Sequence, residues 1–144
     1  MRRILFASDF SKASRKAFAE AVKTARRTHA VLSILHVLTP FVPMGPDQYV
    51  GPETWEEIDT QARKWATRHL EALAEKARSA GVRARVLLIE GTPAREIPRV
   101  ARRTHADLLV IGTHGRTGFA KLFLGSVASH VVAAATCPVL TVRG

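Results

Sequence analysis

A glycine-bearing segment that begins at residue 112 carries the residue spacing that most clearly suggests chemistry. Two glycines three residues apart, Gly112 and Gly115, let backbone N–H groups approach an anion without interference from a Cβ atom. Gly125 and Ser126 then open a predicted helix, where free N–H groups and the helix dipole favour phosphate. The residues concerned are Gly112, Thr113, His114, Gly115, Arg116, Thr117, Gly118, Gly125 and Ser126. Their types and order predict a phosphate-binding segment.

Two side chains of this segment could add to the backbone contacts. Ser126 is expected to cap the helix and to donate its hydroxyl to a phosphate oxygen. Arg116, between the glycines, could supply a charge-assisted hydrogen bond. Loops also collect glycine for other reasons, so the glycines alone are equally typical of an ordinary loop. Their place after a predicted strand and before a helix favours phosphate binding.

Short apolar runs alternate with helical patterns along the chain, and these elements must position the segment. Strands are predicted at 4–7, 31–38, 82–89, 107–112 and 138–142. Helices are predicted after an N-cap at Ser11, over 54–80, from Pro93 behind a Thr92 cap, and over 126–135. Strands separated by helix-length stretches imply a parallel sheet with helices on both faces. The predicted fold class is therefore α/β.

The longest predicted helix, over 54–80, carries both tryptophans of the chain. Trp55 and Trp65 fall on its apolar face with residues such as Ile58 and Leu70. Packing in the core is therefore expected for both tryptophans, rather than stacking on nucleic acid.

Two further strand ends carry polar groups where a ligand of such a sheet would bind. Ser8 and Asp9 follow the first strand, and His36 lies near the end of the second. Asp9 could contact a ligand or merely help to cap the next helix. His36 and His114 could both approach the site. The six histidines show no short ligand spacing with a third acid or thiol, so a dedicated zinc site is not expected.

The composition limits the classes of protein to consider. The chain has 144 residues, 47% hydrophobic and 24% charged, which is typical of one globular domain. The single cysteine, Cys137, excludes an internal disulfide framework and a cysteine-based zinc cluster. No apolar run approaches the ~20 residues that a membrane span needs. A soluble, cytoplasmic, single-domain protein is expected.

The formal net charge of +10 is the unusual feature of this composition. Four arginines, Arg95, Arg99, Arg102 and Arg103, form one basic face of the third predicted helix. This face is expected to be a solvated surface, and the alternative is binding of an acidic partner or nonspecific binding of nucleic acid. No nucleic-acid motif accompanies the charge, so nucleic acid is not the expected partner.

The glycine pattern also carries a resemblance to a known family. A glycine, two residues, a glycine, nine residues and a Gly-Ser pair match Gly112, Gly115, Gly125 and Ser126 at every step. This pattern resembles the ATP-binding signature of the universal stress protein family. Further likeness extends over the whole chain, at Ser8-Asp9-Phe10-Ser11, His36-Val37, Gly91-Thr92-Pro93, Ala106-Asp107-Leu108 and Cys137-Pro138-Val139.

The resemblance implies a fold and a set of ligand contacts. It implies a single nucleotide-binding domain over 1–144, a three-layer sandwich whose five-stranded parallel sheet has the order 3-2-1-4-5. In the family's nucleotide-binding members the residue matching Ala7 lines the adenine pocket, the acid matching Asp9 faces base and ribose, and the backbone matching Val37 meets the adenine edge. Residues matching Gly112–Gly118, Ser126 and Val127 wrap ribose and phosphates. Ala7 and Ile111 replace a frequent proline and methionine, and both keep an apolar wall.

The expected function is that of an ATP-binding stress-response or regulatory module, with Mg or Mn carried by the ATP phosphates. The sequence has no P-loop Lys-Ser/Thr pair and no obvious carboxylate pair or base for in-line phosphoryl transfer, so a fast enzyme is not expected. A slow ATP hydrolase or phosphoryl-transfer enzyme using His114, Arg116 or Asp9 is the alternative. The resemblance also implies a homodimer, formed by pairing of the last strand over 138–142.

Overall fold

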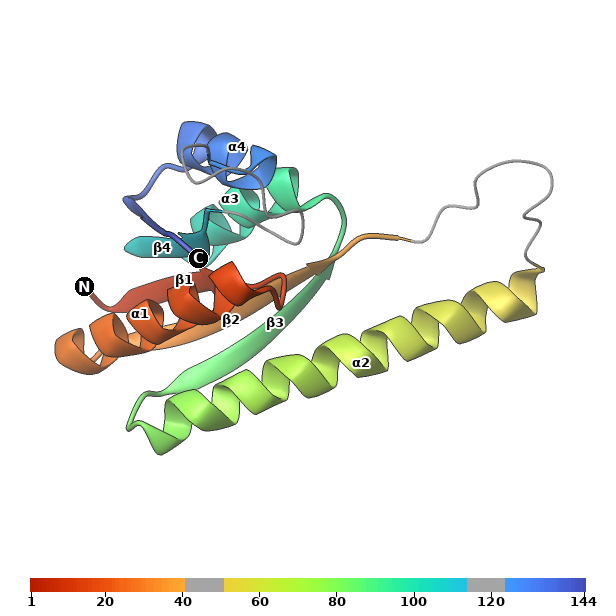
Figure 1. Cartoon of the computed structure of the whole chain (residues 1–144), viewed down its shortest axis with the longest axis horizontal. Coiled ribbons are helices and arrows are strands. Elements are labelled where there is room, and N and C mark those ends of the chain that lie inside the picture. Colours follow the sequence, from red (N-terminus) through yellow and green to blue (C-terminus); the bar gives the residue numbers. More distant parts are fainter. Residues whose placement is uncertain (41–50, 114–123) are drawn as a thin grey trace.

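Nine helices and strands make up the part of the chain that the computed structural model describes, residues 1–40, 51–113 and 124–144 (Figure 1). In chain order they are β1 (Arg3–Ala7), α1 (Lys12–Thr28), β2 (Val31–Leu38), α2 (Pro52–Ser79), β3 (Ala84–Glu90), α3 (Pro93–Arg103), β4 (Leu108–Gly112), α4 (Ser126–Ala134) and β5 (Val139–Val142).

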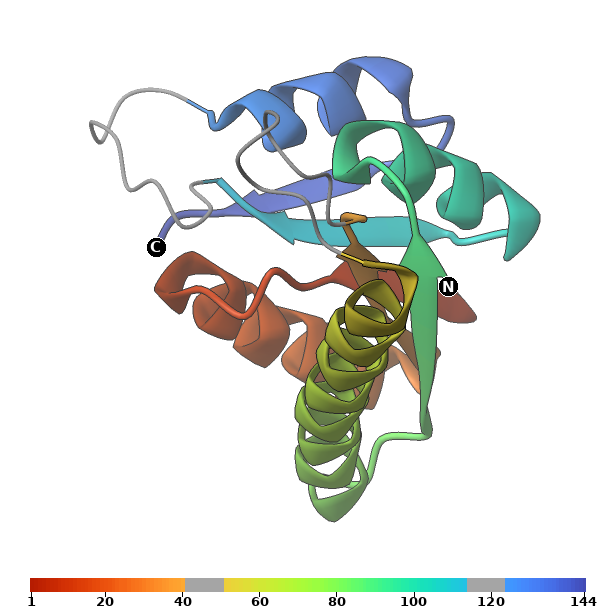
Figure 2. The same ribbon diagram turned by 90° about the vertical axis from the view of Figure 1, so that its right-hand side faces the viewer.

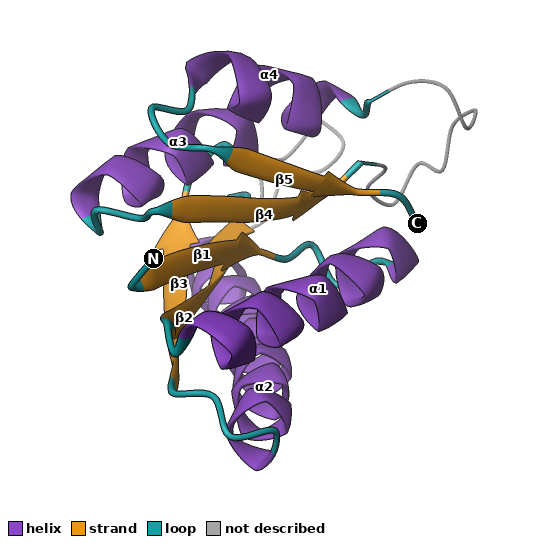
Figure 3. Cartoon of the chain, turned by 90° about the vertical axis from the view of Figure 1, so that its left-hand side faces the viewer, coloured by secondary structure: helices purple, strands orange, loops and turns teal. Residues whose placement is uncertain are grey.

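The five strands form one parallel sheet in the order β3-β2-β1-β4-β5. Helices α1 and α2 lie on one face, and α3 and α4 lie on the other (Figure 3). This arrangement confirms the predicted α/β class and the strand order that the resemblance implied. The order reverses between β1 and β4, because β2 and β3 extend to one side of β1 and β4 and β5 to the other. A crevice is expected beyond the carboxyl ends of β1 and β4.

Alternating side chains of the strands fill two cores. In β1, Ile4 and Phe6 pack toward α1 and α2, whereas Leu5 and Ala7 pack toward α3 and α4. All four are almost completely buried, as are their neighbours on β2 and β4. The near-continuous apolar runs of the sequence follow from this burial on both faces.

Most predicted boundaries agree with the structure to within two residues. Ser11 caps α1 as predicted, since its Oγ accepts a hydrogen bond from the backbone N–H of Ser14 at 3.2 Å. Helix α2 starts at Pro52, two residues before the predicted start. Strand β3 starts at Ala84, two residues late, because the N–H of Val82 still donates to the carbonyl of Ala77 behind the turn at Gly81.

The prediction that both tryptophans pack in the core was wrong for Trp65, which is 37% exposed. The core side of α2 is formed instead by Ala66, Leu70, Ala74 and Ala77. The amino-terminal half of α2 extends beyond the sheet (Figure 1), so the apolar side chains there have less of the sheet to cover. Trp65 packs its ring against Phe10 and His69, at centroid distances of 5.3 and 4.1 Å. Trp55 is half-buried.

The basic face of α3 lies on the surface of the protein. All four arginines of the basic face of α3 are exposed, and Arg99 forms an ion pair with Glu96 at 3.6 Å. Among the helices of the described residues, none has the length and apolar character required to cross a lipid bilayer.

Candidate functional site

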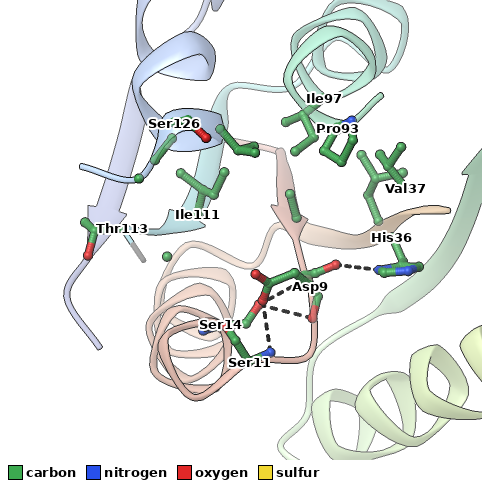
Figure 4. Close-up of a pocket in the computed structure, with 17 residues that line it drawn as sticks. Asp9, Ser11, Ser14, His36, Val37, Pro93, Ile97, Ile111, Thr113 and Ser126 are labelled. Atoms are coloured by element: carbon green, nitrogen blue, oxygen red, sulfur yellow. Dashed lines mark hydrogen bonds between the residues drawn. The ribbon is translucent and has the colours of Figure 1, made fainter. Parts of the chain in front are cut away.

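A hollow of about 360 Å³ opens at the carboxyl ends of β1, β2 and β4 (Figure 4). Nine predicted site residues line it: Ala7, Ser8, Asp9, Val37, Gly112, Thr113, Gly125, Ser126 and Val127. The other five, His114, Gly115, Arg116, Thr117 and Gly118, lie outside the described residues, so the predictions made for them are not addressed. The hollow is where the reversal of strand order places a ligand in an open parallel sheet.

The loop between β1 and α1 forms one wall of the hollow and is held by a network of serines. The backbone N–H of Ser8 donates to the carbonyl of Leu35 at 2.8 Å, which continues the β1–β2 ladder by one residue. The Ser14 hydroxyl donates to Ser8 Oγ at 3.2 Å and accepts from the N–H of Asp9 at 3.1 Å. Ser8 and Ser14 are both buried, so these bonds fix the loop against the first turn of α1.

Asp9 has the helix-capping role that its sequence position suggested, and it also faces the hollow. Its Oδ1 accepts a hydrogen bond from the backbone N–H of Ser11 at 2.9 Å. The carboxylate is half-buried and lines the hollow (Figure 4). The capping bond orients the carboxylate, and Oδ2 makes no hydrogen bond to the residues that the structure describes. The two hypotheses for Asp9 are therefore compatible, because one oxygen can cap while the other meets a ligand.

His36 supports the same loop from β2. Its Nδ1 lies 2.8 Å from the carbonyl oxygen of Ser8, so Nδ1 carries the proton and donates. The imidazole stacks on Phe10 with a centroid distance of 4.5 Å and an interplanar angle of 29°. Phe10 has a φ of 63°, a conformation that only a few per cent of non-glycine residues adopt. Contacts with His36, Trp65 and His69 hold Phe10 in that conformation.

The backbone of Val37 is directed toward the hollow by the register of the sheet. Val31 donates to the carbonyl of Arg2 and Leu35 accepts from Ser8, so alternate residues of β2 turn their backbone groups toward β1. Val37 continues this alternation, but β1 pairs only as far as Ala7 with Leu35. The N–H and C=O of Val37 therefore point past the end of β1, where they can meet one donor and one acceptor of a ligand.

The amino end of α4 is open in a way that corrects one prediction. The N-cap residue is Gly125, with φ −58° and ψ 159°, and no side chain makes a capping hydrogen bond. Ser126 is instead the first helical residue, so the prediction that it caps the helix was wrong. Among the residues that the structure describes, no side chain accepts from the first-turn N–H groups, and Ser126, Val127 and Ala128 line the hollow. Uncapped N–H groups and the helix dipole together suit an anion.

Thr113 carries a buried hydroxyl at the wall of the hollow. Its Oγ1 is buried and makes no hydrogen bond to any residue that the structure describes. A buried hydroxyl left unpaired costs free energy, and buried polar groups in native proteins almost always have a partner. Thr113 lies between β4 and the segment that leads to α4, at the wall of the hollow. A ligand with a polar group is one way to satisfy this hydroxyl.

The structure also revises the role of Gly112. A Cβ atom at this position would lie 3.0 Å from the carbonyl carbon of Ala13 and 3.1 Å from its Cβ and its oxygen. These atoms belong to the first turn of α1, on the opposite face of the sheet from α4. The lack of a Cβ at Gly112 therefore allows close packing of β4 against α1, a role that the sequence argument, which assigned it to anion approach, did not predict.

Several lining residues were not among the predicted ones. They are Ser11, Ser14, Leu35, Pro93, Ile97 and Ala128, whereas His36 and Ile111, which also line the hollow, had been expected near the site and in its apolar wall. Strand alternation could have found Leu35, which lies on the α3 and α4 face with Val37 and Ala7. Helical spacing could have paired Pro93 with Ile97, one turn apart at the start of α3. Among the described residues, no three His, Cys, Asp or Glu side chains come together as a metal-binding group.

Comparisons with known proteins agree with this architecture. The profile of the Universal stress protein family matches residues 1–143. Universal stress protein YxiE of Bacillus subtilis (strain 168) is 37% identical over 151 residues, which cover 98% of this chain and 98% of that protein. The solved structure of universal stress protein UspA from Lactobacillus plantarum has a TM-score of 0.85 at 26% identity, covering 99% of this chain and 97% of that one.

A third comparison concerns a solved complex. A universal stress protein crystallised with cAMP has a TM-score of 0.72 at 24% identity, covering 99% of this chain and 96% of that one. At this identity the likeness shows a shared fold and no more. The profile match over nearly the whole chain and the 37% identity to a full-length relative lead to one conclusion. The chain belongs to the universal stress protein family.

Proposed function

We propose that this chain is an ATP-binding universal stress protein that acts as a nucleotide-dependent stress-response or regulatory module. The observation that carries the proposal is the hollow at the carboxyl ends of β1, β2 and β4. It joins the amino end of α4, which no described side chain caps, to the Thr113 hydroxyl, which has no hydrogen-bond partner among the described residues. Its volume of about 360 Å³ lies in the range typical of small-molecule sites. The cAMP complex of a protein with this fold supports an adenine nucleotide as the ligand class.

The adenine base would occupy the apolar part of the hollow. Ala7, Val37 and Ile97 are buried side chains that line it, and Pro93 lies beside them (Figure 4). The N–H and C=O of Val37, which bond to no described residue beyond the end of β1, match the acceptor and donor on the Watson–Crick edge of adenine. Asp9, at the edge of this region, would accept a hydrogen bond from the ribose or the base.

The phosphates would lie against α4. The first-turn N–H groups of α4 and the Ser126 hydroxyl are hydrogen-bond donors for phosphate oxygens. Thr113, which carries another hydroxyl, lines the same hollow. A Mg²⁺ or Mn²⁺ ion would be held chiefly by the phosphates, because Mg²⁺ needs few protein ligands when it binds a nucleotide. Asp9 is the one carboxylate among the described lining residues.

A binding role fits these groups better than fast catalysis. Phosphoryl transfer needs an in-line nucleophile, a base and metal-positioning acids, and the described part of the hollow offers only one acid. Slow ATP hydrolysis is the second candidate, since a single carboxylate could still orient a water molecule. Single-turnover measurements with enzyme in excess of labelled ATP distinguish retention of ATP from its slow conversion to ADP.

A pair of Ser126 variants tests the proposal. Ser126→Ala removes only the hydroxyl and should weaken ATP binding by about 1–2 kcal/mol, roughly 5- to 30-fold. Ser126→Pro removes the hydroxyl and the N–H. Proline suits the first helical position, and Gly125 already has the extended backbone that a residue before proline needs. Ser126→Pro should therefore keep the fold and weaken ATP binding further.

Calorimetry with ATP and adenosine provides the measurement, with thermal unfolding as the control for folding. Adenosine binding should be nearly unchanged in both variants, because adenosine has no phosphate. Asp9→Ala should show the reverse pattern and weaken ATP and adenosine alike. Absence of ATP binding to the wild-type protein at millimolar nucleotide would refute the proposal. An ATP affinity that Ser126→Pro leaves unchanged would refute the assignment of the phosphates to α4.

Two further properties belong to the same proposal. We expect a homodimer formed by antiparallel pairing of β5 with its twofold copy, which is supported by the position of β5 at the edge of the sheet and by the 36% exposure of Leu140. We also expect the protein to act in the cytoplasm, because its proposed ligand is a cytoplasmic metabolite. Sedimentation and cell fractionation test these two expectations.

A further inference from the structure

A second hollow, of about 600 Å³, lies at the opposite end of the strands, where β1, β2 and β3 begin. Four arginines line it, Arg2 and Arg3 from the start of β1 and Arg83 and Arg85 from the start of β3. The amino ends of these strands gather beside the chain N-terminus, on the left in Figure 1. The hollow is separate from the proposed nucleotide site. From Val31, which lines this hollow, to Val37, which lines the nucleotide site, β2 advances six residue steps, or roughly 20 Å at ~3.3 Å per residue.

The pattern of the sheet explains why arginines gather there. Arg3, Ser33 and Arg85 occupy the same alternation as Leu5, Leu35 and Leu87, which face α3 and α4. Two residues earlier along each strand, this face carries polar side chains instead of core residues. Ser33 pairs with Arg85 in the β2–β3 register. The amino end of this sheet face is thus built as a polar surface, although the same strands are apolar further along.

Two of the guanidinium groups are held in place. Arg85 Nε donates to the Ser33 hydroxyl at 2.7 Å, and Ser33 itself is buried. Arg83 Nη2 donates to the carbonyl of His29 at 3.2 Å, just after α1 ends. Each bond uses one of the five N–H donors of its guanidinium, so several donors remain for a ligand. A side chain held in this way loses less conformational entropy when it binds.

The positive charge of the hollow is largely uncompensated. None of the described residues that line it is acidic, and none of the four arginines forms an ion pair with a described acid. The neighbouring acid is Asp107, whose Oδ2 accepts the backbone N–H groups of Arg2 and Arg3 at 2.7 and 2.9 Å. One carboxylate therefore stands against four guanidinium groups at the starts of β1 and β3, which flank β2, and neighbouring strands lie ~4.8 Å apart. Their mutual repulsion favours a bound polyanion.

We propose that this hollow is a second ligand site, which binds a small polyanion that carries at least two phosphate groups. Guanidinium groups bind phosphate through paired N–H donors, and a multiply charged phosphate chain can meet several of them at once. The hollow is compact, unlike the stripe of charge that tracks a nucleic-acid backbone. This hollow and the proposed nucleotide site lie at opposite ends of the strands, so the second proposal does not depend on the function proposed above.

Inorganic triphosphate is the probe, and paired charge variants carry the test. Arg83→Gln with Arg85→Gln removes two of the charges that line the hollow, and Arg95→Gln with Arg102→Gln removes two likewise exposed charges on α3 as the matched control. Calorimetry at physiological salt should show the first double variant losing 10- to 100-fold in triphosphate affinity and the control less than threefold. Equal losses in the two double variants would mean that net charge alone attracts triphosphate, and would overturn the proposal.

Two further variants keep the test decisive. Ser33→Ala leaves every charge in place but releases Arg85, and it should weaken triphosphate binding several-fold. If one of the two variants, Ser33→Ala or the Arg83/Arg85 double variant, folds poorly, the other still tests the proposal. Triphosphate affinity that is unchanged in the folded variants would overturn the proposal. Ser126→Pro should leave the arginine-dependent binding intact, and loss of all triphosphate binding in Ser126→Pro would assign the ligand to the nucleotide site. Triphosphate binding that persists without ATP binding would refute the proposed function alone.

A nucleic-acid arm separates the two classes of polyanion. A single-stranded oligonucleotide should displace triphosphate from the wild-type protein no better than its phosphate concentration predicts. Displacement at much lower concentration, with a steep dependence on salt, would identify nucleic acid as the partner and would overturn the proposal of a small ligand.

Discussion

Substitution of Gly112 by alanine separates a packing role from a ligand-binding role at the first glycine of the motif. The backbone of Gly112 has no positive φ, so alanine is compatible with its conformation and the effect of the substitution is steric. The new Cβ would lie 3.0–3.1 Å from three atoms of Ala13, closer than ordinary van der Waals contact. Two of those atoms belong to the backbone of α1, so the first turn of α1 must shift by a few tenths of an ångström.

The expected loss of stability follows from two opposing contributions. Overpacking of this kind costs about 1–3 kcal/mol, and the stiffer unfolded chain of alanine returns about 0.4–1 kcal/mol. We expect Gly112→Ala to lower the free energy of unfolding by about 1–2 kcal/mol, which corresponds to a fall of roughly 3–8 °C in Tm for a domain of this size. Urea and thermal unfolding, followed by circular dichroism, measure both quantities.

Gly51→Ala, at the N-cap of α2, serves as the matched control, because a Cβ there would meet no atom of the described residues within 4 Å. Alanine is a weaker N-cap than glycine but makes the unfolded chain stiffer, and these two effects on the free energy of unfolding should cancel to within about 0.5 kcal/mol. The Cβ of alanine at 112 would point toward α1 and away from α4, so ATP affinity of the folded variant should change less than about threefold. Unchanged stability together with a tenfold loss of ATP affinity would refute the packing role and restore the anion-approach hypothesis.

Three further predictions concern other parts of the chain. Thr113→Val should raise the free energy of unfolding by about 1–2 kcal/mol, because it removes a buried hydroxyl that has no partner among the described residues, yet it should weaken ATP binding several-fold. A destabilised variant would show that the hydroxyl has a partner in the free protein. Thr141→Pro should convert the proposed dimer into a folded monomer in sedimentation. The carbonyls of Pro138 and Val142 accept hydrogen bonds from the β4 side, so the N–H of Thr141 points to the free edge of the sheet, where proline would remove a donor; a dimeric variant would exclude β5 pairing. Asp107 has a pKa below its usual value because its carboxylate accepts the N–H groups of Arg2 and Arg3. Its folded pKa is depressed, so its contribution is present above about pH 4 and is lost as the pH falls through the folded pKa. Asp107→Asn should be less stable than wild type at pH 7 in urea unfolding, with a difference that narrows below about pH 4.

The sequence predicted the elements of the fold well, because the signals for them are local. Apolar runs and cap residues such as Ser11 mark where strands end and helices begin, and the structure agrees within two residues. The strand order came from the family resemblance, since nothing in the spacing of strands alone fixes which neighbours pair.

Features that depend on distant contacts were not predictable in the same way. Ser126 was expected to cap α4, but the helix begins one residue earlier than that role requires, and Gly125 is the N-cap. Trp65 follows the apolar pattern of α2, yet α2 extends past the sheet there and the pattern cannot report where the sheet stops. The role of Gly112 depends on Ala13, which is about a hundred residues away in the chain and adjacent in space.

The rings around Phe10 couple the motion of α2 to the loop that carries Asp9. Helix α2 lies beside β3 in Figure 2, and its amino-terminal half extends beyond the sheet in Figure 1. Phe10 contacts His36 on β2 and both Trp65 and His69 on α2, so the loop rests on a strand and a helix at once. Partial opening of α2 removes two of these three contacts and leaves Phe10 in a conformation that its own backbone disfavours. Hydrogen exchange at the amides of residues 9–11 and in the first half of α2 should therefore rise and fall together, and a ligand that orders Asp9 should slow exchange in a helix that it does not touch.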